Sequence, residues 1–142
     1  MQAYGIASFA RGESLTTRQQ NARYVARLVS DEIRFAQSVE IRNEVPGELA
    51  SDIVYFSVDE EGSVLRTTKT EGTEVIAKSA RDTRYSLAFN IVYDDEGDVL
   101  PGVTEIIVGA GPSEFKTSVL GLNLPDDGVS GASSGSVIAV RK

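Results

Sequence analysis

Two acidic turns hold the residues whose types and spacing come nearest to a chemical site. Their sequences are DDEGD at residues 94–98 and DEEGS at residues 59–63. Grouped carboxylates supply the oxygen ligands that Ca²⁺ prefers. The turn at residues 94–98 does not match the D-x-[DN]-x-[DN]-G pattern of a calcium loop, because Gly97 comes too early and no glutamate follows at the required spacing. We predict exposed hairpin turns and no metal site, with calcium binding as the alternative.

The composition excludes most enzyme chemistries. The 142 residues include no Cys, His or Trp, which rules out zinc fingers, thiol nucleophiles, haem ligation and Ser-His-Asp triads. The segment GAGP at residues 109–112 lacks the lysine and the third glycine of phosphate-binding loops. We therefore expect no enzyme activity and no cofactor. The net charge of −7 also argues against direct binding to nucleic acid.

The first element expected along the chain is a helix, from residue 13 to about residue 39. Its apolar residues recur at the 3.6-residue period and give one face wide enough to bury. The T-x-x-Q pattern from Thr16 favours a start near that residue, and the Pro-Gly pair at residues 46–47 requires that the helix has ended. The opposite side carries Arg23, Arg27, Asp31 and Arg34. The residues expected to pack the helix on a sheet are Val25, Val29, Ile33 and Ala36.

From about residue 50 the pattern changes to that of β-strands. Short runs rich in β-branched and aromatic residues predict strands at residues 53–58, 64–68, 73–77, 87–93, 103–108, 115–122 and 136–140. The Ser/Gly-rich stretch at residues 130–135 predicts a flexible loop. We predict an α+β fold, in which a long N-terminal amphipathic helix packs on an antiparallel β-sheet head. Residues 1–40 would form the helical part and residues 41–142 the β-rich globular head.

The order of these elements and the sequence of the helix resemble the type IV pilin-like proteins. This family supplies the subunits of pili, type II secretion pseudopili and competence pili. The segment that carries the resemblance is QQNARYVARLVSDEIRFA at residues 19–36. It is similar to the helix of minor pilins of the W type and of J-type pseudopilins. The closing segment GSVIAVRK at residues 135–142 is similar to the last strand of many such heads.

The resemblance implies a structural subunit, a minor pilin or pseudopilin, that acts in filament assembly or at the filament tip. It also implies a cleaved leader and an apolar anchor of roughly 20 residues, which we expect to be missing here, with residues 2–10 as its remnant. Tyr4, Ile6 and Phe9 would then contact other pilins or pseudopilins. We expect a cell-surface, extracellular or periplasmic filament, with membrane contact only through the missing anchor.

The alternative is an extracellular β-rich adhesin or ligand-binding module. Such modules use aromatic side chains to stack on sugar rings. Only 7% of the residues are aromatic and none is Trp, so the composition favours the structural subunit over the adhesin.

Overall fold

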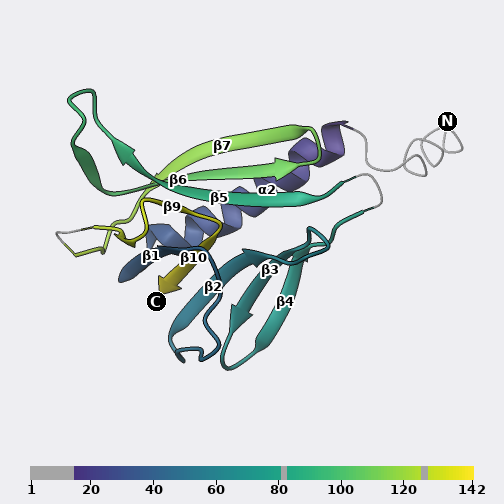
Figure 1. Cartoon of the computed structure of the whole chain (residues 1–142), viewed down its shortest axis with the longest axis horizontal. Helices are drawn as coiled ribbons and strands as arrows, with labels where there is room; N and C mark the ends of the chain where they lie inside the picture. The colour runs from purple at the N-terminus through teal and green to yellow at the C-terminus, as the bar shows by residue number, and fades with distance from the viewer. Residues whose placement is uncertain (1–14, 81–82, 126–127) are drawn as a thin grey trace, which may run out of the picture.

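The structure of the chain is a computed structural model that describes residues 15–80, 83–125 and 128–142. These residues form one helix, α2 (Leu15–Arg34), and strands in two sheets (Figure 1). The strands are β1 (Ser38–Arg42), β2 (Ile53–Val58), β3 (Val64–Thr68), β4 (Gly72–Ala77), β5 (Tyr85–Tyr93), β6 (Val99–Ala110), β7 (Ser113–Leu120), β8 (Ser130–Gly131), β9 (Ser134–Gly135) and β10 (Val137–Arg141).

The predicted fold class, a long helix on one antiparallel sheet, is wrong. The chain is mostly β, and its strands divide between a six-stranded sheet of order β4-β3-β2-β10-β1-β8 and a four-stranded sheet of order β7-β6-β5-β9. The six-stranded sheet is mixed, because β1 pairs with β8 in parallel and its other pairings are antiparallel. Hairpins fix neighbouring strands locally, whereas the division into two sheets depends on pairings between distant segments.

The helix is shorter than expected because the residues after Arg34 are recruited into a sheet. Val39 and Ile41 are buried while their neighbours in β1 are half-exposed, which is the alternation of a strand. The backbone N–H of Gln37 donates to the carbonyl of Arg141 at 2.8 Å, so pairing with β10 begins at once. The boundary predicted at residue 40 falls inside β1.

The last strand, β10, lies in the middle of the six-stranded sheet. It pairs with β1 on one side, with Val39 opposite Val140, and with β2 on the other. Its residues Val137, Ile138, Ala139 and Val140 are all buried. A strand buried on both faces contains consecutive apolar residues rather than an alternating pattern.

The Ser/Gly-rich segment at residues 130–135 is not the flexible loop that its composition predicted. Its first two residues form β8, which pairs with β1, and its last two belong to β9, which pairs with β5. A Cβ on Gly131 would clash with the carbonyl oxygen of Ile41, and a Cβ on Gly135 would clash with that of Arg42. The glycines therefore let this segment pass close to β1 and join the edges of both sheets.

A single hydrophobic core lies between α2 and the two sheets. The four residues expected to pack the helix, Val25, Val29, Ile33 and Ala36, are fully buried in it; Ala36 follows the helix rather than belonging to it. The helix packs mainly against β6 and β7. On its other side the carboxylate of Glu32 forms ion pairs with Arg66 of β3 at 3.6 Å and Lys142 at 3.0 Å.

Ile33→Asp is expected to unfold the protein, because it places an unpaired charge at a fully buried position. A loss of about 4 kcal/mol or more in the free energy of unfolding would remove most of the stability of a typical domain. Urea denaturation measures it, with Tyr24→Asp as the control, since Tyr24 lies on the same helix and is 55% exposed. Equal losses in both variants would contradict the packing of Ile33 in the core.

Thr104→Val is expected to stabilise the protein. Thr104 is fully buried in β6, and its Oγ1 has no hydrogen-bond partner in the part of the chain that the structure describes. Replacing this hydroxyl with a methyl group should add about 1 kcal/mol to the free energy of unfolding. Thr104→Ser keeps the hydroxyl and removes a methyl group, so it should lower the unfolding midpoint. A Val variant less stable than wild type would show that the hydroxyl has a partner.

Candidate functional site

The β5–β6 hairpin extends beyond the body of the molecule as an arm, defined here as residues 93–100 (Figure 1). At its base Tyr93 pairs with Val99 across the two strands. These side chains are 53% and 48% exposed, and that of Leu100 is 37% exposed. The arm therefore presents apolar side chains to solvent at a place where no core lies beneath them.

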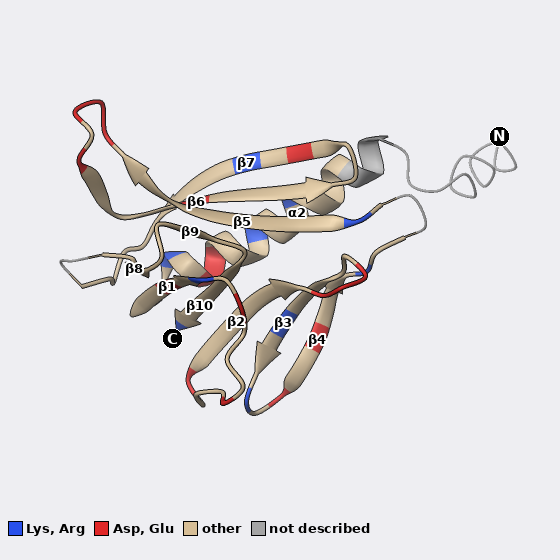
Figure 2. Cartoon of the chain, in the orientation of Figure 1, with Lys and Arg blue, Asp and Glu red and all other residues tan. Residues whose placement is uncertain are grey.

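The tip of the arm is the acidic turn at residues 94–98, which Figure 2 shows as a red loop. The Oδ1 atom of Asp94 accepts hydrogen bonds from the backbone N–H groups of Glu96 and Asp98, each at 2.9 Å. Gly97 has a φ of 88°, which a side chain at this position would disfavour. The prediction of an exposed hairpin turn is confirmed. No group of three or more acidic, Cys or His side chains suited to a metal ion occurs among the described residues.

The turn at residues 59–63 repeats this structure bond for bond. The Oδ1 atom of Asp59 accepts from the N–H groups of Glu61 and Ser63, again at 2.9 Å, and Gly62 has a φ of 87°. Two segments of similar sequence thus form the same turn, as expected when local hydrogen bonds determine the backbone conformation.

The two turns differ in their surroundings. Arg84 donates a hydrogen bond from Nη2 to the carbonyl oxygen of Glu60, and the N–H of Tyr85 donates to that of Gly62 at 2.8 Å. Gly62 is buried as a result, whereas Gly97 is exposed. Within the described ranges, no residue outside the β5–β6 hairpin bonds to the turn at residues 94–98. The turn on the arm therefore lacks the hydrogen bonds that Arg84 and Tyr85 make to the turn at residues 59–63.

A second surface feature is an open groove of about 400 Å³ between α2 and β7, called here the arginine groove. Arg23, Arg27 and Arg34 line it, and they share one face of the helix because they are four and seven residues apart. The guanidinium of Arg23 lies 5.7 Å from the centre of the Phe115 ring on β7. Arg34 lies 3.9 Å from Asp31, and both are about half exposed.

Arg27 has no ion pair with any residue that the structure describes. Its side chain is exposed, and it lies between Arg23 and the Asp31–Arg34 pair on the same helix. The groove therefore has an excess of positive charge on a protein whose net charge is −7. Such a local excess attracts carboxylates more than the overall charge would suggest.

Further exposed apolar residues gather where α2 ends. Phe35 is 62% exposed and Leu122 is 60% exposed. Their segments are joined by the N–H of Leu122, which donates to the carbonyl of Arg34 at 2.8 Å, and by Asn123, which donates to that of Phe35 at 3.5 Å. This end of the helix carries a second group of exposed apolar side chains, and Gly121, next to Leu122, donates to the carbonyl of Gly102 at 2.9 Å, two residues beyond the arm.

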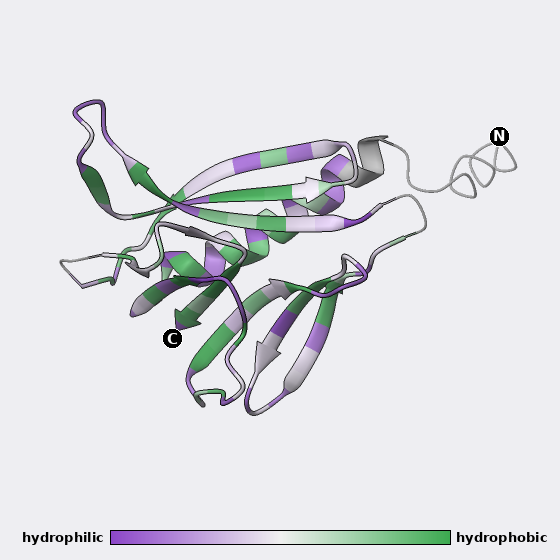
Figure 3. Cartoon of the chain, viewed as in Figure 1, coloured by the Kyte–Doolittle hydropathy of each residue, from purple (hydrophilic) through white to green (hydrophobic). Residues whose placement is uncertain are grey.

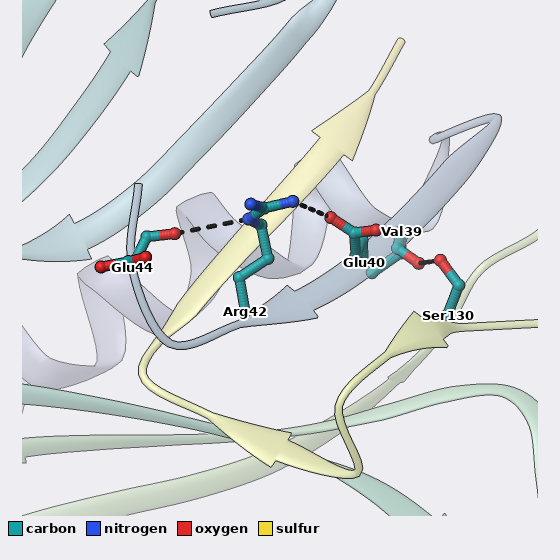
Figure 4. Close-up of polar contacts among 5 residues, drawn as sticks. All are labelled: Val39, Glu40, Arg42, Glu44 and Ser130. Carbon is teal, nitrogen blue, oxygen red and sulfur yellow. Dashed lines mark hydrogen bonds and ion pairs between the residues drawn. The ribbon is translucent and has the colours of Figure 1, made fainter. Parts of the chain in front are cut away.

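The charged residues of β1 have a structural role on the outer face of the six-stranded sheet (Figure 4). Arg42 forms an ion pair with Glu40 at 2.6 Å and donates from Nε to the carbonyl of Glu44 at 3.4 Å. The hydrogen bond to Glu40 raises the pKa of Arg42 above its usual value. Ser130 donates to the carbonyl of Val39 at 3.2 Å and fastens β8 to the sheet edge.

Subunit contacts were expected at Tyr4, Ile6 and Phe9, which lie outside the described residues. Tyr93, Val99 and Leu100 were not predicted as contact residues. The signal was present, because apolar residues stand on both sides of the acidic turn, but the sequence does not say that the core ends before them. Figure 3 shows apolar positions on the arm as well as in the body.

No helix among the described residues is long and apolar enough to span a membrane. No protein-family model, curated protein or solved structure matches this chain.

Alanine substitution of the two matching aspartates should separate the two turns. Asp59→Ala is expected to lower the free energy of unfolding by about 1–2 kcal/mol, because it frees two N–H groups in a turn packed on the body. Asp94→Ala should loosen only the arm and change the free energy of unfolding by about 0.5 kcal/mol or less. Urea denaturation measures the free energy of unfolding of both variants, and amide exchange of residues 93–100 reports the loosening of the arm. Equal global losses would contradict the independence of the arm.

Proposed function

We propose that the chain is a structural subunit of the minor pilin or pseudopilin kind, in a type IV pilus, a competence pilus or a type II secretion system. The observation that carries the proposal is the β5–β6 arm, which projects exposed apolar side chains together with an uncovered acidic turn. Exposed apolar groups rimmed by charge are characteristic of protein–protein contacts. The helix sequence at residues 19–36 adds the resemblance to pilin-like subunits.

In this role the subunit works through contacts and carries out no reaction. Burying Tyr93, Val99 and Leu100 against a neighbour would contribute at most about 1.5–3 kcal/mol for each side chain. Ordering and desolvation consume part of that gain, so the arm alone makes a weak contact. Phe35 and Leu122 offer a second contact surface at the end of α2. Several weak contacts per subunit suit a filament, in which each subunit touches more than one neighbour.

The proposal includes the location and partners of such a subunit. The partners are other pilins or pseudopilins, at the cell surface or in an extracellular or periplasmic filament. Attachment to the membrane before assembly would be through an N-terminal anchor, as in the pilin-like proteins that the helix resembles. The role requires neither a cofactor nor contact with nucleic acid.

Cross-linking in the cells that make this protein tests the proposal. A photo-crosslinking amino acid replaces Val99 on the arm, and in a control it replaces Glu74, which is exposed on β4. Mass spectrometry should identify pilin-type subunits linked at position 99, in several-fold higher yield than at position 74. Linkage at position 99 to glycans or to unrelated host proteins alone would favour an adhesin and contradict the proposal.

A further inference from the structure

We infer that the arginine groove of one copy receives the acidic turn of the β5–β6 arm of a second copy. This inference rests on the proposed function, since it names one of the contacts that the subunit makes. The groove presents Arg23, Arg27 and Arg34 on one face of α2. The turn presents the exposed carboxylates of Asp95, Glu96 and Asp98.

The turn at residues 59–63 shows how such a turn is covered within this protein. There an arginine, Arg84, donates to the carbonyl oxygen of the second turn residue, Glu60. The corresponding carbonyl in the arm belongs to Asp95, and no described residue donates to it. Arg27 is exposed in the groove and has no ion pair within the described ranges, so its donors are available for that position. Hydrogen bonds from arginine to charged or carbonyl oxygens are directional as well as attractive.

The turn of one copy does not reach the end of the groove at Arg23 in the same copy. Phe115, in the groove, is opposite Val108 on β6, whereas the turn ends where β6 begins, at Val99. Nine residues of extended strand separate these two positions along β6, a distance of about 30 Å. Arg23 and the turn thus belong to opposite ends of the four-stranded sheet, so that a second copy is needed to join them. Arg34, whose carbonyl accepts from Leu122, lies at the end of the sheet nearer the turn.

A contact between two different surfaces of the same chain does not close on itself. After one such contact, one copy keeps a free turn and the other keeps a free groove, so addition continues as a row unless the rotation closes a ring. The net charge of −7 opposes the approach of two copies, and the attraction between the groove and the turn offsets this repulsion locally. Salt at physiological strength screens the long-range repulsion beyond about 8 Å and leaves the contact pairs less affected.

Charge reversal with position-matched controls tests the inference on the purified chain. The arm variant carries Asp95→Lys and Glu96→Lys, and the groove variant carries Arg23→Glu and Arg27→Glu. The control variant carries Glu60→Lys and Glu61→Lys, which makes the same change in net charge at the matching positions of the covered turn. Circular dichroism and urea denaturation first establish that each variant is folded.

Sedimentation equilibrium over a range of protein concentrations gives the association constant. Wild type should self-associate weakly, and the arm and groove variants should each lose about tenfold or more in affinity. The control variant should associate as well as wild type or better, since it reduces the overall negative charge. An equimolar mixture of the arm and groove variants should regain association, because the lysines of one then face the glutamates of the other.

Three results would overturn the inference: a wild-type chain that stays monomeric throughout, an equal loss in the control variant, or no recovery in the mixture. Binding of a single-stranded oligonucleotide to a monomeric wild type would also overturn it, by giving the groove another occupant. These outcomes are separate from those of the cross-linking at Val99. Cross-links to pilin-type subunits from a chain that is monomeric alone would support the proposed function and refute the copy-to-copy contact. A chain that self-associates as described but gives no cross-links to pilin-type subunits would support the copy-to-copy contact and contradict the proposed function.

Discussion

The structure depends first on the position of β10 between β1 and β2. This strand supplies backbone partners to both neighbours, and without it β1 and β2 would each have one unpaired edge. It also holds the end of α2 in place, because Gln37 bonds to Arg141 and Lys142 pairs with Glu32. The helix, the six-stranded sheet and the core between them are therefore joined by six residues at the end of the chain.

The sequence predicts the local parts of this fold well and the non-local parts poorly. The ranges of β2 and β3 agree with expectation, and so does the turn between them, because alternation, β-branched residues and the bonds from Asp59 are all local. β1 was missed, although Val39 and Ile41 alternate with charged residues, since the helical period runs up to them. β8 and β9 were missed because their Ser and Gly residues gain partners only from β1 and β5.

The candidate surfaces show the same contrast between local features, which the sequence predicts, and contacts between distant segments, which it does not. The two acidic turns were predicted as turns, and their hydrogen bonds are the same, yet one is covered by Arg84 and the other is not. That difference arises from where the segment around Arg84 passes, which no pattern within either turn encodes. The arginines of α2 were recognised as a polar face, whereas the groove exists only because β7 lies beside them. The turns and the polar face of the helix could thus be predicted, but the distant segments that lie beside them could not.

The Ser/Gly-rich segment that joins both sheets has a consequence for the order of folding. Residues 130–141 complete one sheet through β8 and β10 and the other through β9. A growing chain that has exposed β1 to β7 therefore has open strand edges in both halves until this segment emerges. Pairings over such long sequence separations form slowly, and open edges invite aggregation. The last twelve residues of the sheets therefore decide when both open edges are closed.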